Sequence, residues 1–330
     1  MNALRYPLLG LLLAGSLAGC ASNPPRPPGD PAIARCLDLY AALDAAVAEH
    51  GSTPSSPTRI AGFPHLRADR FLADFRERAL TPTETVAWLT RLGNLNLEAR
   101  RVEWASLPAE NRAELNRRHA PAGDVPAALE TCADPLRAAD LADPERLASI
   151  REGARVADEY LTVNQTLGLY PLAMLPVNYG ILRYQEETRA LFARPLGELP
   201  VSGELHRYGS PAVAPAPADF AAIRRDALAI PEPTPDQLAT LFAIHAPIWE
   251  IDVATDADRP GSPYWQADGT PAVDASKPAI YRYVSYASWL GKPLLQLNYL
   301  IWFAARPKTG ALDLLGGPLD GVLWRVTLDS

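Results

Sequence analysis

The sequence predicts an α+β fold with a helical amino-terminal half and an antiparallel sheet towards the carboxyl terminus. Between Ile33 and about Arg155, apolar residues recur at the spacing of a helix face, whereas after His245 they alternate as in strands. The 330 residues are 48% hydrophobic and 21% charged. This composition can build one large or two moderate hydrophobic cores. We expect a helical region at 32–158 and a mixed region at 159–330.

The first helices are predicted from their buried face and their caps. Apolar residues share one face of an initial helix and of a short second one; they are Ile33, Leu37, Tyr40, Leu43 and Val47, then Phe71, Leu72 and Phe75. The clearest helix start is the segment "TPTE", in which Thr81 can cap, Pro82 suits the first helical position and Glu84 can bond back to the cap. We expect this helix to pause at Gly93 and to resume after it.

Shorter helices are expected further along the chain, at 109–118, 126–132, 143–153, 181–192 and 234–245. Residues 159–178 are aromatic and interrupted by proline, so we expect a joint between the two halves there. The segment "SPAVAPAPADF", residues 210–220, is typical of a surface loop.

Four strands are expected after the last helix, at 245–253, 279–290, 293–305 and 320–328, separated by Gly, Pro and Asp. In the third of them, Gln296 and Asn298 interrupt an otherwise apolar face. Because buried polar groups need hydrogen-bond partners, this pair predicts partners on the neighbouring strands.

The amino terminus is typical of a signal peptide at 1–19, with Arg5 followed by an apolar run from Leu8. The residues Leu17, Ala18, Gly19 and Cys20 resemble the lipobox of bacterial lipoproteins. The resemblance implies that Cys20 receives a lipid, with acyl chains such as palmitate, and becomes the first residue of the mature protein. An ordinary secretory signal with a chance cysteine is the alternative.

This resemblance implies a location as well. In the lipoprotein family, a residue other than aspartate after the cysteine, here Ala21, favours the periplasmic face of the outer membrane. Residues 20–31 are rich in proline and predict an extended stalk between the membrane and the globular body.

With Cys20 lipidated, Cys36 and Cys132 remain. An even count in an oxidising compartment predicts a disulfide between them. A free nucleophilic thiol is the competing interpretation, and it would require a nearby base and a reducing compartment.

Charge and motifs exclude several classes of function. The net charge of −7 argues against a nucleic-acid partner, which would need a basic face. The segment "KTG" at residues 308–310 occurs in penicillin-binding proteins and serine β-lactamases, but the Ser-x-x-Lys motif of those enzymes is missing from the sequence. The elbow motif of serine hydrolases and the paired histidines of zinc proteases are missing too.

One segment, "HAPIWEIDVATDAD", combines a histidine with carboxylates. His245 lies where a helix gives way to a strand on which Glu250 and Asp252 share a face, and it points to the other face unless the chain bends at Pro247. Because carboxylates lie close in the sequence and could tune it, His245 is our candidate catalytic histidine, with Glu250 or Asp252 as its partner. A purely structural histidine is the alternative. The acidic residues that follow do not have the spacing of a calcium loop, and we expect neither a metal nor a cofactor.

Polar residues within the expected sheet form a second candidate set. We assign them to substrate binding: Arg282, Tyr286, Gln296, Asn298 and Arg325. They could line a cleft in which arginines hold an anionic group, or they could form a buried network that fixes strand register.

The last third of the chain resembles uncharacterised proteobacterial lipoproteins, a resemblance carried by "HAPIWEID", "LLQLNYLIWFAARP" and "LDGVLWRVTL". It implies location rather than activity. Two hypotheses follow: an envelope lipoprotein that binds a protein or a cell-wall component, or a periplasmic hydrolase or transferase that acts on an envelope polymer or an anionic substrate.

Overall fold

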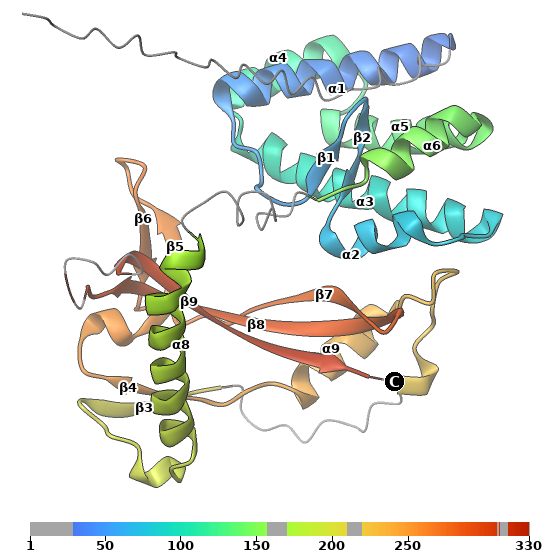
Figure 1. Ribbon diagram of the computed structural model, residues 1–330. Coiled ribbons are helices and arrows are strands. Elements are labelled where there is room, and N and C mark those ends of the chain that lie inside the picture. Colours follow the sequence, from blue (N-terminus) through green and yellow to red (C-terminus); the bar gives the residue numbers. More distant parts are fainter. Residues whose placement is uncertain (1–28, 157–169, 210–219, 309, 311–315, 330) are drawn as a thin grey trace, which may run out of the picture. The chain divides into compact units, whose positions relative to one another are not determined.

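The computed structural model describes residues 29–156, 170–209, 220–308, 310 and 316–329 (Figure 1). The expected signal peptide, Cys20 and most of the stalk lie outside the described residues, as does most of the expected loop at 210–220. The chain forms two compact units. We call them the helical unit, Met1–Ala68 with Leu92–Arg155, and the sheet unit, Asp69–Arg91 with Val156–Ser330.

The helical unit is built from α1 (Pro31–His50), the end of α3 (Pro82–Ser106), α4 (Ala109–His119), α5 (Val125–Ala142) and α6 (Pro144–Gly153). Helices α1, α5 and α6 start in the same way. An aspartate accepts a hydrogen bond from the first turn and a proline lies in that turn; the aspartates are Asp30, Asp124 and Asp143. The core of the unit gathers apolar residues of α1, α4 and α5, with Leu97 and Trp104 of α3 packed against it.

A short antiparallel hairpin, β1 (Thr58–Ile60) and β2 (Phe63–Ala68), also belongs to the helical unit. Sequence analysis did not predict it. The chain turns at Gly62, whose φ of +80° is readily accessible only to glycine. Most of β2 is buried, although two of its buried residues are His65 and Arg67.

Among the described residues, the helices of the sheet unit are α2 (Arg70–Ala73), the start of α3, α8 (Tyr170–Phe192) and α9 (Pro235–Ile244). Short 3-10 turns lie at Asp74–Glu77, Leu196–Glu198, Phe220–Ala222 and Asp256–Asp258. Three expected boundaries were wrong: α3 runs through Gly93 without a pause, α5 continues ten residues beyond Cys132, and α8 begins eleven residues before Ile181. Within the described ranges, every helix is too short or too polar to span a bilayer.

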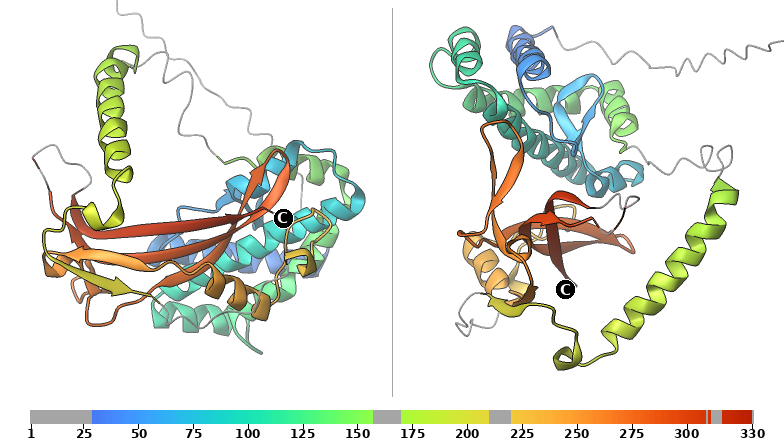
Figure 2. Two further views of the ribbon diagram at one scale, coloured as in Figure 1. Left: turned by 90° about the horizontal axis from the view of Figure 1, so that it is seen from below. Right: turned by 90° about the vertical axis from the view of Figure 1, so that its left-hand side faces the viewer.

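The predicted α+β class and carboxyl-terminal antiparallel sheet are confirmed (Figures 1 and 2). The five-stranded sheet contains β5 (Pro260–Trp265), β6 (Pro271–Asp274), β7 (Tyr281–Trp289), β8 (Lys292–Arg306) and β9 (Gly317–Leu328). The long β8 pairs with β7 and β5 along one edge and with β9 along the other. A separate ribbon joins β3 (Glu204–Tyr208) to β4 (Trp249–Val253).

Side chains of β7, β8 and β9 divide between two faces of the sheet, because directly opposed residues in antiparallel strands point the same way. One face, which we call the covered face, contributes Leu295, Leu297 and Tyr299 to a core shared with Leu241 and Phe242 of α9. The other, which we call the open face, is formed by nine residues in three rows: Tyr281, Leu300 and Leu323; Tyr283, Asn298 and Arg325; Ser285, Gln296 and Thr327.

Candidate functional site

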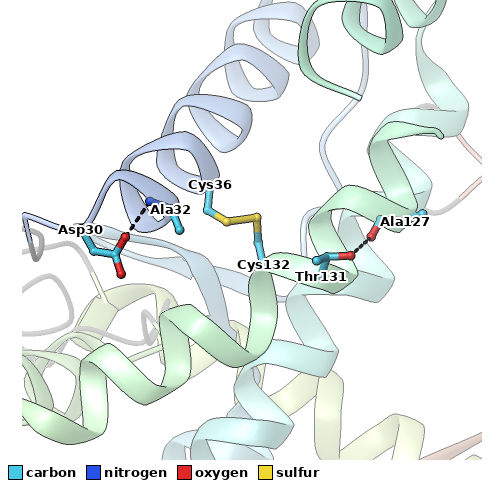
Figure 3. Close-up of a disulfide and its surroundings, with 6 residues drawn as sticks. All are labelled: Asp30, Ala32, Cys36, Ala127, Thr131 and Cys132. Carbon is cyan, nitrogen blue, oxygen red and sulfur yellow. Dashed lines mark hydrogen bonds between the residues drawn. A yellow bond between two sulfur atoms is a disulfide. The ribbon is translucent and has the colours of Figure 1, made fainter. Parts of the chain in front are cut away.

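The predicted disulfide is confirmed. Cys36 of α1 and Cys132 of α5 are bonded, with their Cα atoms 5.6 Å apart (Figure 3). Both cysteines are buried, and neither is a free thiol. The two cysteines are 96 residues apart in the sequence, and their bond links α1 to α5 within the core of the helical unit. Cys20, the expected lipidation site, lies outside the described residues.

The three candidate catalytic residues lie at the end of α9 and on β4. His245 follows α9, where its ring contacts Phe220 at 6.1 Å between centroids, and its Nε2 atom is buried without a hydrogen-bond partner among the described residues. Glu250 lies opposite Arg207 on β3. Asp252 accepts hydrogen bonds from the backbone N–H groups of Ser202 and Gly203, both at 2.7 Å.

Through these hydrogen bonds, Asp252 stabilises the loop before β3. Both of its carboxylate oxygens already accept backbone hydrogen bonds, which leaves it less available as a base. No hydrogen bond joins His245 to Glu250 or Asp252 among the described residues. Within the same described part of the chain, no three His, Cys, Asp or Glu side chains gather in an arrangement that could hold a metal ion.

Three of the five candidate binding residues meet on the open face. Asn298 is fully buried; its Nδ2 donates to Ser285 Oγ at 2.9 Å and to the carbonyl oxygen of Tyr283 at 3.1 Å. Its Oδ1 accepts from Arg325 Nε at 2.7 Å. Gln296 lies in the next row.

Gln296 continues this network across the three strands. Its Oε1 accepts from Ser285 Oγ at 3.0 Å, and its Nε2 donates to Thr327 Oγ1 at 3.2 Å. The expectation that Gln296 and Asn298 find partners on the neighbouring strands is therefore confirmed. The network crosses β7, β8 and β9 and holds their register.

Arg282 and Tyr286 lie on the covered face instead, because they oppose Tyr299 and Leu295. The guanidinium of Arg282 lies 5.6 Å from the ring centre of Phe242. Tyr286 stacks on Phe71 with ring centres 5.5 Å apart, and its hydroxyl donates to the carbonyl oxygen of Pro231. Burial raises the pKa of Tyr286 above its usual value, so the hydroxyl remains protonated and able to donate. The five residues therefore do not form one cluster.

The open face also presents side chains that sequence analysis did not select. Tyr281 and Tyr283 are 39% and 44% exposed, and Leu323 is 39% exposed. The two tyrosines are neighbours on one face of β7, about 7 Å apart at the rise of a strand. Together with the exposed Arg325 and Thr327, they place aromatic rings, a cation and hydroxyl groups on one accessible surface.

A buried charge network in the helical unit was missed as well. Glu103 of α3 is fully buried and accepts hydrogen bonds from Arg67 at 2.6 Å, from Arg59 at 2.8 Å and from Arg100 at 3.0 Å. Asp44 of α1 binds Arg59 and Arg100 as well. The network joins the β1–β2 hairpin to α1 and α3, and its signal in the sequence was only a set of charges in otherwise apolar elements.

The network governs the ionisation of Glu103. Burial alone raises the pKa of Glu103, but the hydrogen bonds from Arg67 and Arg59 and the charge of Arg100 outweigh it, so the pKa lies below its usual range. Burial also raises the pKa of nearby Tyr40 to about 12. Because Glu103 and Arg67 are closed off from solvent, this arrangement stabilises the unit and is not accessible to a substrate.

A second buried cluster lies beside it. His65 Nε2 and Asp140 Oδ2 are 2.7 Å apart, and Arg146 donates from Nε and Nη2 to the other carboxylate oxygen of Asp140. All three side chains are buried, and the Arg146 guanidinium lies 4.9 Å from the ring centre of Phe63. The cluster ties β2 to α5 and α6.

A cavity of about 250 Å³ lies at the end of β3. Its lining includes Arg207, Tyr208, Pro260, Ile280 and Ile301, and only the first two have polar side chains. It offers fewer groups for recognition than the open face.

Comparison of the chain with protein-family models, with curated proteins and with solved structures finds no match.

Proposed function

We propose that the protein is a lipoprotein anchored through Cys20 at the periplasmic face of the outer membrane, and that it binds a cell-wall polymer through the open face of its sheet. The observation that carries the proposal is the grouping of exposed Tyr281 and Tyr283 with Arg325 on one surface. Aromatic side chains can stack on sugar rings, and an arginine can pair with a carboxylate.

The geometry of Arg325 fits this role. Its Nε atom is held by Asn298, which fixes the guanidinium on the open face, and the side chain remains exposed. An arginine held by a neighbour loses less conformational freedom on binding an anion. A cell-wall polymer that carries both sugars and carboxylates would use both kinds of contact.

Location is supported by the lipobox resemblance and by the proline-rich stalk. The disulfide supports it too, because such bonds persist in oxidising compartments such as the periplasm. The alternative enzyme, using His245 with Glu250 or Asp252, has less support, since Asp252 is engaged by backbone groups and His245 Nε2 is buried.

Binding to purified peptidoglycan sacculi tests the proposal. The mature chain from residue 20, carrying Cys20→Ala, should co-sediment with sacculi. A Tyr281→Ala and Tyr283→Ala double variant should bind about tenfold more weakly, because two aromatic contacts worth roughly 0.5–1.5 kcal/mol each are lost. Both side chains are partly exposed, so thermal stability should change little.

A matched control is Tyr264→Ala with Trp265→Ala, two exposed aromatic residues on β5. This control should bind like the wild type. Equal binding by the Tyr281 and Tyr283 double variant would contradict the assigned surface. Failure of the wild type to sediment would contradict a cell-wall ligand and favour a protein partner.

A further inference from the structure

Helix α8 exposes more large apolar side chains than any other described element. Six of the 20 exposed large hydrophobic residues lie on it: Tyr179, Ile181, Leu182, Tyr184, Leu191 and Phe192. Every residue from Asn178 to Phe192 is exposed except Thr188. Packing normally stabilises a helix by burying an apolar face, so this face requires a partner.

Four of the six exposed apolar residues share one side of the helix. At 100° per residue, Ile181, Tyr184, Leu191 and Phe192 fall within a stripe about 100° wide, whereas Tyr179 and Leu182 lie on the other side. The charged residues of this part of α8 lie outside the stripe: Arg183, Glu186, Glu187 and Arg189. Arg183 and Glu187, both outside the stripe, pair with each other at 2.9 Å.

The two ends of α8 differ in charge. Its first thirteen residues, Tyr170 to Leu182, include no charged residue, whereas its last ten include four. A helix that spans a bilayer needs about 20 predominantly apolar residues, which α8 does not provide. An exposed apolar stripe beside charged residues is the pattern of helices that lie in the plane of the membrane interface.

We propose that α8 is a membrane-surface helix, with its apolar stripe inserted among the headgroups and upper acyl chains of the bilayer that holds the Cys20 anchor. This proposal rests on one part of the proposed function, the lipid anchor at Cys20, which brings the bilayer close to the chain. Pro31, the first residue of α1, follows Cys20 by eleven positions in the sequence, so a lipid on Cys20 would hold the chain at the bilayer. Tethering raises the effective concentration of the chain at the membrane, which makes even a weak insertion productive.

The charges of α8 indicate how it binds. Two arginines and two glutamates cancel, so the helix has no net attraction to anionic lipids. Insertion of the apolar stripe is then the main source of affinity, and Tyr184 within it suits the interface because its ring is apolar with a polar tip. Binding should therefore depend little on salt or on anionic lipid.

Vesicle flotation of the non-lipidated chain tests this proposal. The probe is a vesicle of phosphatidylethanolamine and phosphatidylglycerol in a three-to-one ratio, compared with one of phosphatidylcholine alone. The chain from residue 20 with Cys20→Ala should float with both. A Tyr184→Glu and Phe192→Glu double variant should lose at least about tenfold in partitioning, since two charges enter the apolar stripe. The control Tyr264→Glu with Trp265→Glu, on β5, should float like the parent.

A direct readout of depth is available because the parent chain has no free thiol once Cys20 is removed. A fluorophore attached to Phe192→Cys should shift to the blue on adding vesicles, whereas one attached to Trp265→Cys should not. Absence of flotation by the parent would overturn the proposal. A parent chain that forms a dimer by sedimentation and binds no vesicles would also overturn it, if the double variant is monomeric. The partner of α8 would then be a second copy of the chain. Since the chain carries no lipid, a failure of Cys20 lipidation would not affect this result.

Discussion

Glu103 is the residue on which the buried network of the helical unit depends, since it accepts hydrogen bonds from three arginines. Glu103→Gln removes the charge but keeps the shape, and it leaves Arg67 buried without a counter-charge. Breaking a buried ion pair in this way costs about 3–5 kcal/mol. The free energy of unfolding, measured by urea denaturation, should fall by that amount.

The matched control is Glu130→Gln, because Glu130 pairs with Arg101 at 2.7 Å but both side chains are more than half exposed. Loss of this exposed ion pair should change the free energy of unfolding by less than about 1 kcal/mol. Equal effects of the two substitutions would contradict the burial of Glu103.

The lowered pKa of Glu103 also predicts how stability depends on pH. A carboxyl group whose folded pKa lies below its unfolded value stabilises the protein above the unfolded pKa, and this contribution is lost as pH falls through the folded pKa. The difference in unfolding free energy between wild type and Glu103→Gln should be largest near neutral pH and shrink below about pH 4, near the unfolded value. If the difference in unfolding free energy between the two proteins stayed constant on acidification, the lowered pKa of Glu103 would be contradicted.

The sequence predicted that Gln296 and Asn298 need hydrogen-bond partners, but it did not predict the arginines that surround Glu103. Two polar residues in an apolar strand need partners wherever the neighbouring strands lie, so the requirement can be read from one segment. The partners of Glu103 come from α3 and from a hairpin that was not predicted. Only the fold brings them together.

The turn between β7 and β8 decides which polar residues share a face. Leu290 and Gly291 form a two-residue connection with φ angles of +50° and +79°, and they pair Trp289 with Lys292. This register sets Arg282 and Tyr286 on the opposite face from Asn298. Leu-Gly lacks the asparagine or aspartate typical of such a tight turn, so the register could not be predicted from the sequence.

The ends of the helices could not be predicted from the sequence either. Capping residues predicted where α3 and α9 begin, and both starts are as expected. Interior glycine and proline were poor guides to where a helix stops, since α3 passes Gly93 and α5 passes Pro135. Tertiary packing outweighs the cost of about 1 kcal/mol for an interior glycine.

The disulfide between α1 and α5 should contribute substantially to the stability of the helical unit. Replacing Cys36 and Cys132 with alanine opens a loop of about a hundred residues, and the expected loss in unfolding free energy is about 2–5 kcal/mol. Urea denaturation of the double variant, beside the wild type under non-reducing conditions, measures it. A loss below about 0.5 kcal/mol would show that helix packing alone holds α1 against α5.

The whole molecule combines two folded units with an expected membrane anchor. Composition and periodicity predicted the α+β class, because each depends on the local pattern of apolar residues. The division between units was less accessible, since Asp69–Arg91 groups with the sheet rather than with the helices that flank it in the sequence. Such a grouping depends on contacts over long sequence distances.

Anchoring gives the molecule its proposed place of action. The cell-wall surface proposed for the open face and the membrane surface proposed for α8 both require the chain to reach the envelope. That requirement rests on one residue, Cys20, and on the lipobox that precedes it.

Metabolic labelling with an alkyne analogue of palmitate, followed by fractionation of the envelope, tests this claim most directly. The wild type should incorporate the label and fractionate with the outer membrane, and Cys20→Ser should lose both properties. Cys132→Ser, the matched cysteine control, should keep the label. An unlabelled wild type recovered in the soluble fraction would contradict the account.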